Sequence, residues 1–365
     1  MVCRLLQLTL LVFLPHHLWA QAGEADSAAH AVQPSIEALP ILTYDTDVGF
    51  GYGAKVFFLN QLRQKESLDL VAFNSTKGER WYRIGFSVPD FEVRQGTVYS
   101  TAFDLAIDYD KFLKNNFYGV GNRSRKESRE AYTKEPLEIS GLVSRGFTTR
   151  FVGQLGLKYK TVRNFNLAGG GLLATTSPSL NQGRSYALTI IASIRYDSRD
   201  SYVNPHDGAV LQTELEVGRK SLGSDYNLAS SIISAQLYRP VLFSEMVVAL
   251  RWQSQIVGGD ALPVHALATL GGSRTLRGYT QDRFLDRVMM LTNLELRFPL
   301  YWRFHGVGFV DAGKVWDRVR LVDLVRWEEN VGIGLRYILD TFLVRADVGL
   351  GSEGVGFYLN FGQLF

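Results

Sequence analysis

Three arginines lie close together in the segment GGSRTLRGYTQDRF, which runs from Gly271 to Phe284. They are Arg274, Arg277 and Arg283, and the segment also holds three glycines and several uncharged polar residues. A guanidinium group makes two parallel hydrogen bonds to a carboxylate, so the chemistry open to this segment is ion pairing. An arginine held away from water must be paired, and its carboxylate partners must come from the elements around it.

The rest of the chain offers little for catalysis or metal binding. The histidines outside the N-terminal segment are scattered without metal-ligand spacing: His30, His206, His265 and His305. The sequence contains no G-x-S-x-G nucleophile motif, and its glycine runs do not precede a helix as a phosphate-binding loop must. We therefore expect no enzyme activity, no cofactor and no metal. A catalytic pair of serine, histidine or aspartate on a barrel wall stays open as an alternative.

The N-terminus predicts export. Arg4 precedes an apolar run from Leu5 to Leu14, and small residues follow at Ala20 to Ala22. This order is typical of a secretory signal peptide, which we place at residues 1–22. Residues Gly23 to Gln33 are small and polar, and we predict a short flexible periplasmic tail over residues 23–37. The one cysteine, Cys3, lies inside the signal, so the mature chain would hold no disulfide.

The composition also excludes one class of partner. The formal net charge of the 365-residue chain is only +3, whereas a nucleic-acid partner normally requires a strongly basic face. The most apolar later region, from Ser231 to Trp252, is interrupted by Arg239, Pro240 and Glu245, so it does not predict a membrane helix.

Apolar and polar residues alternate along most of the chain from about Pro40 onward. Typical runs are Leu294, Leu296, Phe298 and Leu300 against Asn293, Glu295 and Arg297, and Val331, Ile333, Leu335 and Tyr337 against Gly332, Gly334 and Arg336. Many such runs reach about 10 residues, the length of a tilted membrane strand, whereas soluble strands are usually about half as long. The pattern predicts an all-β fold that crosses a membrane.

The connections between these runs alternate in length. Long ones cover Asp110–Glu135, Arg163–Arg184 and Gly258–Arg287, and short ones, such as Thr148–Thr149, lie between them. This asymmetry is typical of outer-membrane barrels. We predict a single antiparallel transmembrane β-barrel of about 16 strands over residues 38–365, in the outer membrane of a Gram-negative cell.

The chain ends in GFYLNFGQLF, an aromatic run that predicts the barrel-closing strand. We expect this strand to continue to the last residue, because an open sheet edge is costly in lipid. Phe361 and Phe365 are its candidate closing and assembly-signal residues.

Several motifs resemble the BamA/TamA superfamily of outer-membrane barrels, also called the bacterial surface antigen family. They are LRGY at Leu276–Tyr279, FVDAGKVW at Phe309–Trp316, YDSRDSYVNPHDG at Tyr196–Gly208, FYGVGN at Phe117–Asn122 and the closing FYLNFGQLF. In order and spacing they cover residues 40–365. The resemblance implies that the extracellular loop after the eleventh strand folds into the lumen.

The resemblance further implies that Arg277 meets a carboxylate on the lumen wall. Asp311 is the first candidate and Glu295 the second, and the alternation places both on the lumen face. Gly278 would allow a tight turn, and Tyr279 would add an apolar contact. The predicted latch consists of Arg277, Gly278, Tyr279, Glu295, Asp311 and Gly313. A static plug and a moving part both need these residues, so both interpretations stay open.

The YDSRD element falls in a connection that we place in the periplasm. Asp197, Arg199 and Asp200 could form a small charge network there, shaped by Pro205 and Gly208. The simpler interpretation, a turn whose polar groups satisfy one another, is the one that we favour.

The implied function is insertion or translocation of protein or lipid at the outer membrane, through a weak seam between the first and last strands. Family members that insert or secrete proteins carry periplasmic POTRA domains. Only about 20 mature residues precede the first predicted strand here, too few for such a domain. A passive porin-like channel and a surface adhesin are the alternatives, which bilayer conductance and loop deletion would separate.

The same resemblance sets the expected partners. They are outer-membrane lipids and lipopolysaccharide, the outer-membrane assembly machinery and periplasmic chaperones that would handle this chain as a client, and an unidentified periplasmic accessory protein. No nucleic acid is expected among them.

Overall fold

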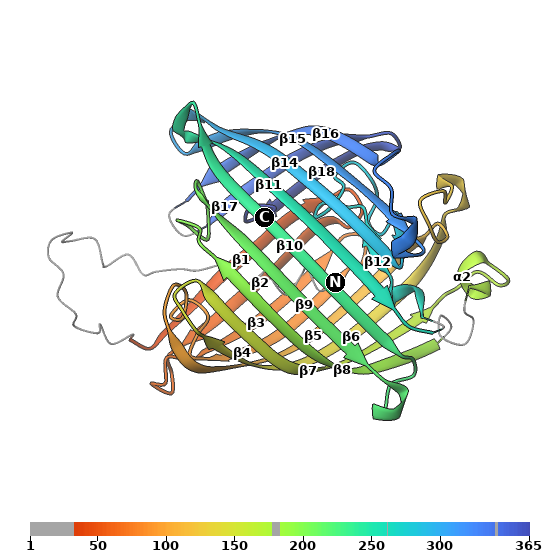
Figure 1. The fold of residues 1–365 in the computed structure, drawn as a ribbon, viewed down its shortest axis with the longest axis horizontal. Coiled ribbons are helices and arrows are strands. Elements are labelled where there is room, and N and C mark those ends of the chain that lie inside the picture. The colour runs from red at the N-terminus through yellow and green to blue at the C-terminus, as the bar shows by residue number, and fades with distance from the viewer. Residues whose placement is uncertain (1–32, 177–182, 261, 340–341) are drawn as a thin grey trace, which may run out of the picture.

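The computed structural model describes residues 33–176, 183–260, 262–339 and 342–365. They form a closed antiparallel barrel of 16 strands, which confirms the predicted fold class and strand number (Figure 1). The predicted signal peptide lies outside the described residues, as does most of the predicted tail. The first strand begins at Ser35, inside the segment predicted as a tail.

The barrel strands follow the chain order, and two further short strands pair with each other. The barrel contains β1 (Ser35–Asp45), β2 (Gly49–Leu59), β3 (Ser67–Ser75), β4 (Arg80–Val88), β5 (Tyr99–Phe117), β6 (Glu130–Gly146), β7 (Phe151–Phe165), β8 (Gly183–Asp197), β9 (Gly208–Gly218), β10 (Leu228–Val241), β11 (Phe243–Gly258), β14 (Val288–Tyr301), β15 (Phe304–Trp316), β16 (Glu328–Ile338), β17 (Leu343–Gly351) and β18 (Gly354–Phe361). The separate pair is β12 (Ala268–Leu270) with β13 (Phe284–Asp286).

Helices are short and lie in the connections. They are η1 (Lys126–Ser128), α2 (Leu172–Thr175), η2 (Lys220–Leu222), η3 (Val264–Ala266) and η4 (Val319–Leu321). Within the described ranges, no helix is long and apolar enough to cross a membrane.

The alternation seen in the sequence corresponds to an outer face and a lumen face of each barrel strand. In β16, Val331, Ile333 and Leu335 are 52%, 71% and 41% exposed on the outer face. On the inner face of the same strand, Arg336 is buried. A continuous exposed apolar wall is unfavourable in water and favourable against lipid chains, whereas the polar face can line a lumen. Because side chains alternate along a strand with a period of two, every second residue of a barrel strand faces the lumen.

The two rims of the barrel differ. One rim, called here the long-loop rim, carries the connections 118–129, 166–182, 219–227, 259–287 and 317–327 (Figure 1, near α2). The other, the short-turn rim, carries connections such as 147–150 and 302–303. The first predicted long connection is shorter than expected, because β5 and β6 stay paired as far as Phe117 and Glu130.

The closing strand is shorter than predicted. β18 ends at Phe361, so the expectation that it continues to Phe365 is wrong. The chain turns at Gly362, whose φ of +80° suits glycine, and then enters the lumen. Phe365 is buried there with its ring 6.2 Å from that of Tyr238, and Arg297 Nη2 donates a hydrogen bond to its carbonyl oxygen at 3.3 Å. The ring of Phe365 thus packs inside the lumen, which it would not reach if the strand continued along the barrel wall.

The seam between the first and last strands is short. β1 and β18 share two register pairs, Tyr44 with Leu359 and Asp45 with Tyr358. The same β1 strand pairs with β2 along its whole length, from Ser35 to Asp45. No strand in the described part of the chain therefore pairs with the other edge of β1 from Ser35 to Thr43. Unpaired strand edges readily accept another strand, so the seam is the weakest joint of the barrel wall.

The membrane-facing wall generates the first prediction. Ile333→Lys places a charge at the centre of β16 on the outer face, where insertion into lipid should cost about 2–4 kcal/mol. Chemical unfolding in lipid vesicles would measure the loss in free energy. Leu222→Lys in η2, at an exposed position in a long-loop-rim connection, is the matched control and should change stability little. Equal effects at both positions would contradict a lipid-facing wall.

Candidate functional site

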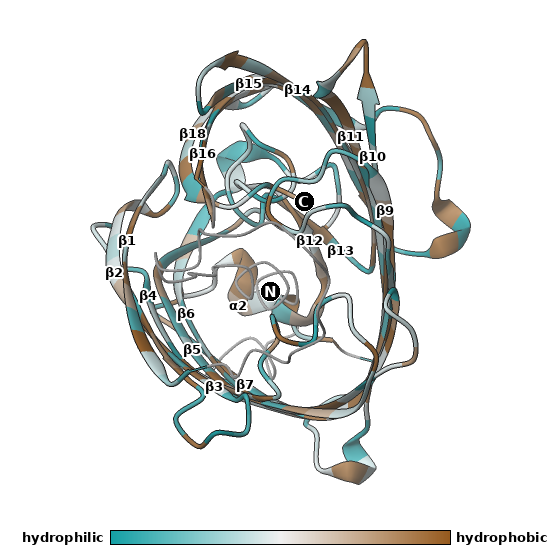
Figure 2. Cartoon of the chain, turned by 90° about the vertical axis from the view of Figure 1, so that its left-hand side faces the viewer, coloured by the Kyte–Doolittle hydropathy of each residue, from teal (hydrophilic) through white to brown (hydrophobic). Residues whose placement is uncertain are grey.

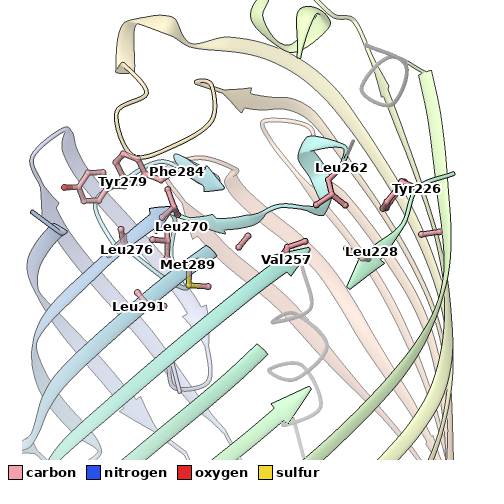
Figure 3. Packing of buried hydrophobic residues seen from close by; sticks show 13 residues of the cluster. Tyr226, Leu228, Val257, Leu262, Leu270, Leu276, Tyr279, Phe284, Met289 and Leu291 are labelled. Carbon is pink, nitrogen blue, oxygen red and sulfur yellow. The ribbon is translucent and has the colours of Figure 1, made fainter. Parts of the chain in front are cut away.

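The connection between β11 and β14, residues 259–287, folds into the barrel and is called here the inserted loop. Figure 2 shows its strands β12 and β13 inside the ring of barrel strands. Its buried apolar side chains hold it against the wall, as Figure 3 shows for Leu270, Leu276, Tyr279 and Phe284 packed near Met289 of β14. This packing fixes the position of the arginine that lies between Leu276 and Gly278.

Arg277 is fully buried and meets both predicted carboxylates. Its Nε and Nη2 donate to the two oxygens of Asp311 at 2.9 and 2.7 Å, which is a bidentate pair. Its Nη1 donates to Glu295 Oε1 at 2.8 Å. The Arg277 guanidinium carbon also lies 3.3 Å from the centre of the Phe309 ring, so the cation is stacked as well as paired.

The carboxylate of Asp311 accepts hydrogen bonds from other groups as well as from the Arg277 side chain. The side-chain amides of Asn293 and Asn330 donate to its two oxygens at 2.7 and 2.9 Å. The backbone N–H of Arg277 donates to it at 3.3 Å. A buried carboxyl group is tolerated only when its polar atoms are hydrogen-bonded in this way, so side chains of β14 and β16 help to hold Asp311 of β15 beside the arginine.

A third carboxylate, which the sequence did not identify, completes the site. Asp347 on β17 accepts a hydrogen bond from Arg277 Nη1 at 3.2 Å and another from Arg336 Nη1 at 2.5 Å. Glu295 also accepts from Arg297 at 2.9 Å. The pattern of β17, in which Asp347 alternates with outward residues, could have placed Asp347 on the lumen face, but it could not show which loop residue lies above it.

The inserted loop lies directly on the backbone of β17. A Cβ added to Gly349 would lie 2.6 Å from the carbonyl carbon of Arg277, and one added to Gly278 would lie 2.6 Å from the Gly351 nitrogen. Gly278 also has φ of +103°, which glycine adopts freely. Gly313 of the predicted latch makes room for Leu270, since a Cβ there would lie 2.9 Å from it.

Tyr279 has both an apolar and a polar role. Its ring lies 5.5 Å from that of Phe284, as expected for an apolar contact. Its hydroxyl, which the sequence did not predict to bond, donates to the Glu329 carbonyl at 3.1 Å and lies 3.0 Å from Ser352 Oγ. Tyr279 therefore fixes the loop to β16 and to the turn before β18.

The inserted loop contacts both sides of the seam. The backbone N–H of Gly278 donates to the hydroxyl of Tyr358 on β18 at 3.0 Å. The backbone N–H of Gln281 donates to Asp47 Oδ2, in the turn after β1, at 2.6 Å. These two contacts, called here the seam ties, hold the loop to both sides of the seam. Directly across the seam, β1 and β18 share two register pairs, and Thr46 makes three hydrogen bonds with the backbone of Phe357.

A second arginine of the loop closes the long-loop rim. Arg283 Nε and Nη2 donate to both oxygens of Glu353 at 2.6 and 2.7 Å, and its Nη1 donates to Ser124 Oγ at 2.7 Å. Glu353 lies between β17 and β18, and Ser124 lies in the connection that carries the FYGVGN motif. The loop is thus anchored at two levels, by Arg277 in the lumen and by Arg283 at the rim.

The predicted charge network at the short-turn rim is divided in two. Arg199 pairs with Asp197 at 2.7 Å. Asp200 instead accepts backbone N–H bonds from His206 and Asp207 at 3.0 and 3.2 Å. Both halves are locally satisfied, which agrees with the simpler interpretation of this turn.

The site holds charges but no arrangement suited to metal. No group of three or more His, Cys, Asp or Glu side chains in the described ranges could hold a metal ion. Four guanidinium groups, those of Arg277, Arg297, Arg336 and Arg345, instead surround the three carboxylates Glu295, Asp311 and Asp347.

This fold and site define a class of protein: a membrane-type β-barrel that holds an arginine-bearing loop inside its lumen. Within that class, the chain belongs to the Omp85 superfamily, because the Omp85 superfamily domain matches residues 65–365. No curated protein matches the chain.

Solved structures show the same fold. BamA from Haemophilus ducreyi lacking POTRA domains 1–3 has a TM-score of 0.68 at 17% identity, over 90% of this chain and 70% of that one. CdiB from Acinetobacter baumannii has a TM-score of 0.58 at 15% identity, over 92% of this chain and 61% of that one. CdiB from Escherichia coli has a TM-score of 0.60 at 12% identity, over 91% and 68%. At these identities the likeness concerns the barrel itself.

The buried ion pairs generate a stability prediction. Arg277→Ala should destabilise the barrel by about 3–5 kcal/mol, because it leaves Asp311 and Glu295 buried without their main partner. Unfolding followed by the gel-mobility shift of heated barrels would measure the loss. Arg239→Ala removes an exposed pair with Asp207 at the short-turn rim and should cost no more than about 1 kcal/mol. A loss for Arg277→Ala as small as that of the control would refute the latch.

The Asp47 tie generates a pH prediction. Burial, with repulsion from Asp45, raises the pKa of Asp47 to about 7. A raised acid pKa means that the folded state holds the proton more tightly, so stability falls as pH rises from about 4 to about 7. Asp47→Asn should remove this loss, seen as a smaller difference in Tm between pH 5 and pH 8. Glu127→Gln, on the exposed η1, should keep the wild-type difference; if Asp47→Asn also keeps it, the assignment fails.

Proposed function

We propose that this Omp85 barrel assists the insertion or translocation of protein or lipid at the outer membrane, by opening laterally between β1 and β18. The long-loop rim then faces the outside of the cell and the short-turn rim faces the periplasm. Outer-membrane lipids and lipopolysaccharide surround the wall. The outer-membrane assembly machinery and periplasmic chaperones handle the chain as a client, and an unidentified accessory protein delivers substrate.

The observation that carries this proposal is the imbalance in strand pairing at the seam. Two register pairs join β1 to β18, whereas β17 and β18 are paired from Val344–Phe361 to Gly351–Gly354. Each backbone hydrogen bond contributes about 0.5–1.5 kcal/mol net, so the seam can separate at a small fraction of the cost of any other joint.

The inserted loop supplies the control that such an opening needs. Its network with β14 to β17 is buried and multiply bonded, so these four strands remain rigid when the seam opens. The seam ties at Tyr358 and Asp47 are single hydrogen bonds. Because β18 stays paired with β17, opening breaks the Asp47 tie, the two register pairs and the hydrogen bonds between Thr46 and Phe357. The Arg277 network stays intact.

A disulfide across the seam tests the proposal. Tyr44→Cys with Leu359→Cys places two thiols on register partners of β1 and β18, close enough for a disulfide. The natural Cys3 lies within the predicted signal peptide and should not interfere. We expect oxidation to abolish client-barrel insertion and phospholipid transfer in proteoliposomes, and reduction to restore the active process.

The matched control links the same Leu359→Cys to its neighbour on the other side. Ala346→Cys lies opposite Leu359 on β17, at a joint that is fully paired. Oxidation of this pair should leave activity unchanged. Full activity in the oxidised β1–β18 barrel would overturn lateral opening.

A passive channel is the second candidate, because the lumen below the inserted loop keeps a cavity of about 630 Å³. Polar side chains such as Gln154, Gln236 and Gln255 line part of it. A large, steady, ion-selective conductance that persists in the oxidised β1–β18 barrel would favour this channel over the proposed function.

A further inference from the structure

Arg345, on the lumen face of β17, is buried without adequate pairing. It is 4% exposed, and its nearest carboxylate oxygen is Asp347 Oδ2, 3.6 Å from its Nε. Asp347 already accepts closer hydrogen bonds from Arg277 and Arg336. Neither Nε nor Nη1 of Arg345 has a hydrogen-bond partner among the described residues. Because buried guanidinium donors without hydrogen bonds are costly, these donors point to an anion that is not part of the chain.

A second unused donor lies beside the first. Asn360 on β18 is the register partner of Arg345, and its buried Nδ2 also has no hydrogen-bond partner in the described part of the chain. Both residues line the lumen cavity. The guanidinium of Arg345 and the amide of Asn360 thus offer neighbouring N–H groups to one oxyanion.

The side chains beside Asn360, on the seam side of the two donors, are apolar. Ile41 of β1 packs in one cluster with Val71 and Phe73, and Phe361, the residue after Asn360, packs against this cluster. On the outer face of the wall, Leu42 and Phe357 are exposed. Apolar side chains thus lie on both faces of the wall at the seam, whereas Arg345 borders the charged network through Asp347.

The donors also lie near the short-turn rim. β17 begins at Leu343 and β18 ends at Phe361, so Arg345 and Asn360 are within about 7 Å of the strand ends at that rim. β1 continues from there to Ser35 without a partner on this edge in the described structure. In the orientation of the proposed function, the gap beneath the end of β18 therefore faces the headgroups of the periplasmic leaflet.

We propose that Arg345 and Asn360 bind the phosphate headgroup of an anionic phospholipid that enters sideways below the end of β18. This site names a substrate class for the proposed function, and it rests on the lateral opening described there. A phosphodiester is charged at physiological pH and accepts several hydrogen bonds, while its acyl chains remain against the apolar side chains at the seam. A peptide carboxylate would pair with the same guanidinium, but the apolar side chains beside Asn360 favour a lipid.

Lipid retention tests the site without requiring any transport. The full barrel is placed in nanodiscs of phosphatidylglycerol and phosphatidylcholine, extracted into a phosphate-free detergent, and examined by native mass spectrometry. Wild type should retain phosphatidylglycerol about tenfold more than phosphatidylcholine, because the choline ammonium would add a second cation beside a network with one more guanidinium than carboxylates. Arg345→Gln removes this excess charge and should lose the preference. Asn360→Leu should weaken retention about threefold, by the loss of one neutral hydrogen bond.

A matched control removes a different lumen arginine. Arg195→Gln on β8 lies in the same cavity lining but on the opposite part of the wall, and it should retain phosphatidylglycerol like wild type. If Arg345→Gln does not fold, the Asn360→Leu measurement decides alone. Undiminished preference in the variants at both Arg345 and Asn360 would overturn the site.

Two competitors distinguish the sources of the anion. Inorganic phosphate at millimolar concentration should not displace the lipid; displacement would assign the site to a soluble anion. A peptide with a free C-terminal carboxylate should displace lipid no better than its amide; a clear difference would assign the site to polypeptide ends. Either result overturns the lipid site and leaves the seam-disulfide experiment to judge the proposed function separately.

Discussion

The structure depends on one constraint: a guanidinium group placed inside a narrow barrel, out of contact with water, must be neutralised there. Arg277 satisfies this requirement with Asp311, Glu295 and Asp347 from three different strands. Removing any one partner would leave a buried charge, so the strands, the inserted loop and the arginine are mutually required. The close contact of Gly278 and Gly349 with neighbouring backbone then follows, because a short loop must bring the arginine to the wall.

This constraint divides the barrel into a rigid and a separable part. The strands β14 to β17 share a buried network with the inserted loop, whereas β1 and β18 share two register pairs and the hydrogen bonds between Thr46 and Phe357. A single hydrogen bond ties the loop to each side of the seam. A barrel wall in lipid cannot leave many backbone groups unpaired. The unpaired edge of β1 at the short seam must therefore serve a function or be covered by a partner. The unpaired length of β1 and the unused donors at Arg345 lie next to each other, at the same end of the seam.

The C-terminal residues leave the barrel wall and pack inside the lumen. The sequence favoured a strand continuing to Phe365, because aromatic residues recur with the right period. The structure ends β18 four residues earlier than that, and Phe365 packs against Tyr238 and under the guanidinium of Arg297 instead. Gln363 bonds to Asn204 in the turn before β9 at 2.9 Å, so the tail also ties the last strand to the short-turn rim.

The sequence by itself determined the local features. Alternation in runs such as Val331 to Tyr337 is set by the backbone period, and it predicted the strands, their number, the inside face and the lumen position of Asp311 and Glu295. Only the tertiary structure decided which residues from distant strands meet. Asp347 reaches Arg277, and Arg345 is left short of a partner, because closing the sheet into a barrel brings β17 beneath the inserted loop. That juxtaposition depends on the register of every strand pair together, which no local pattern specifies.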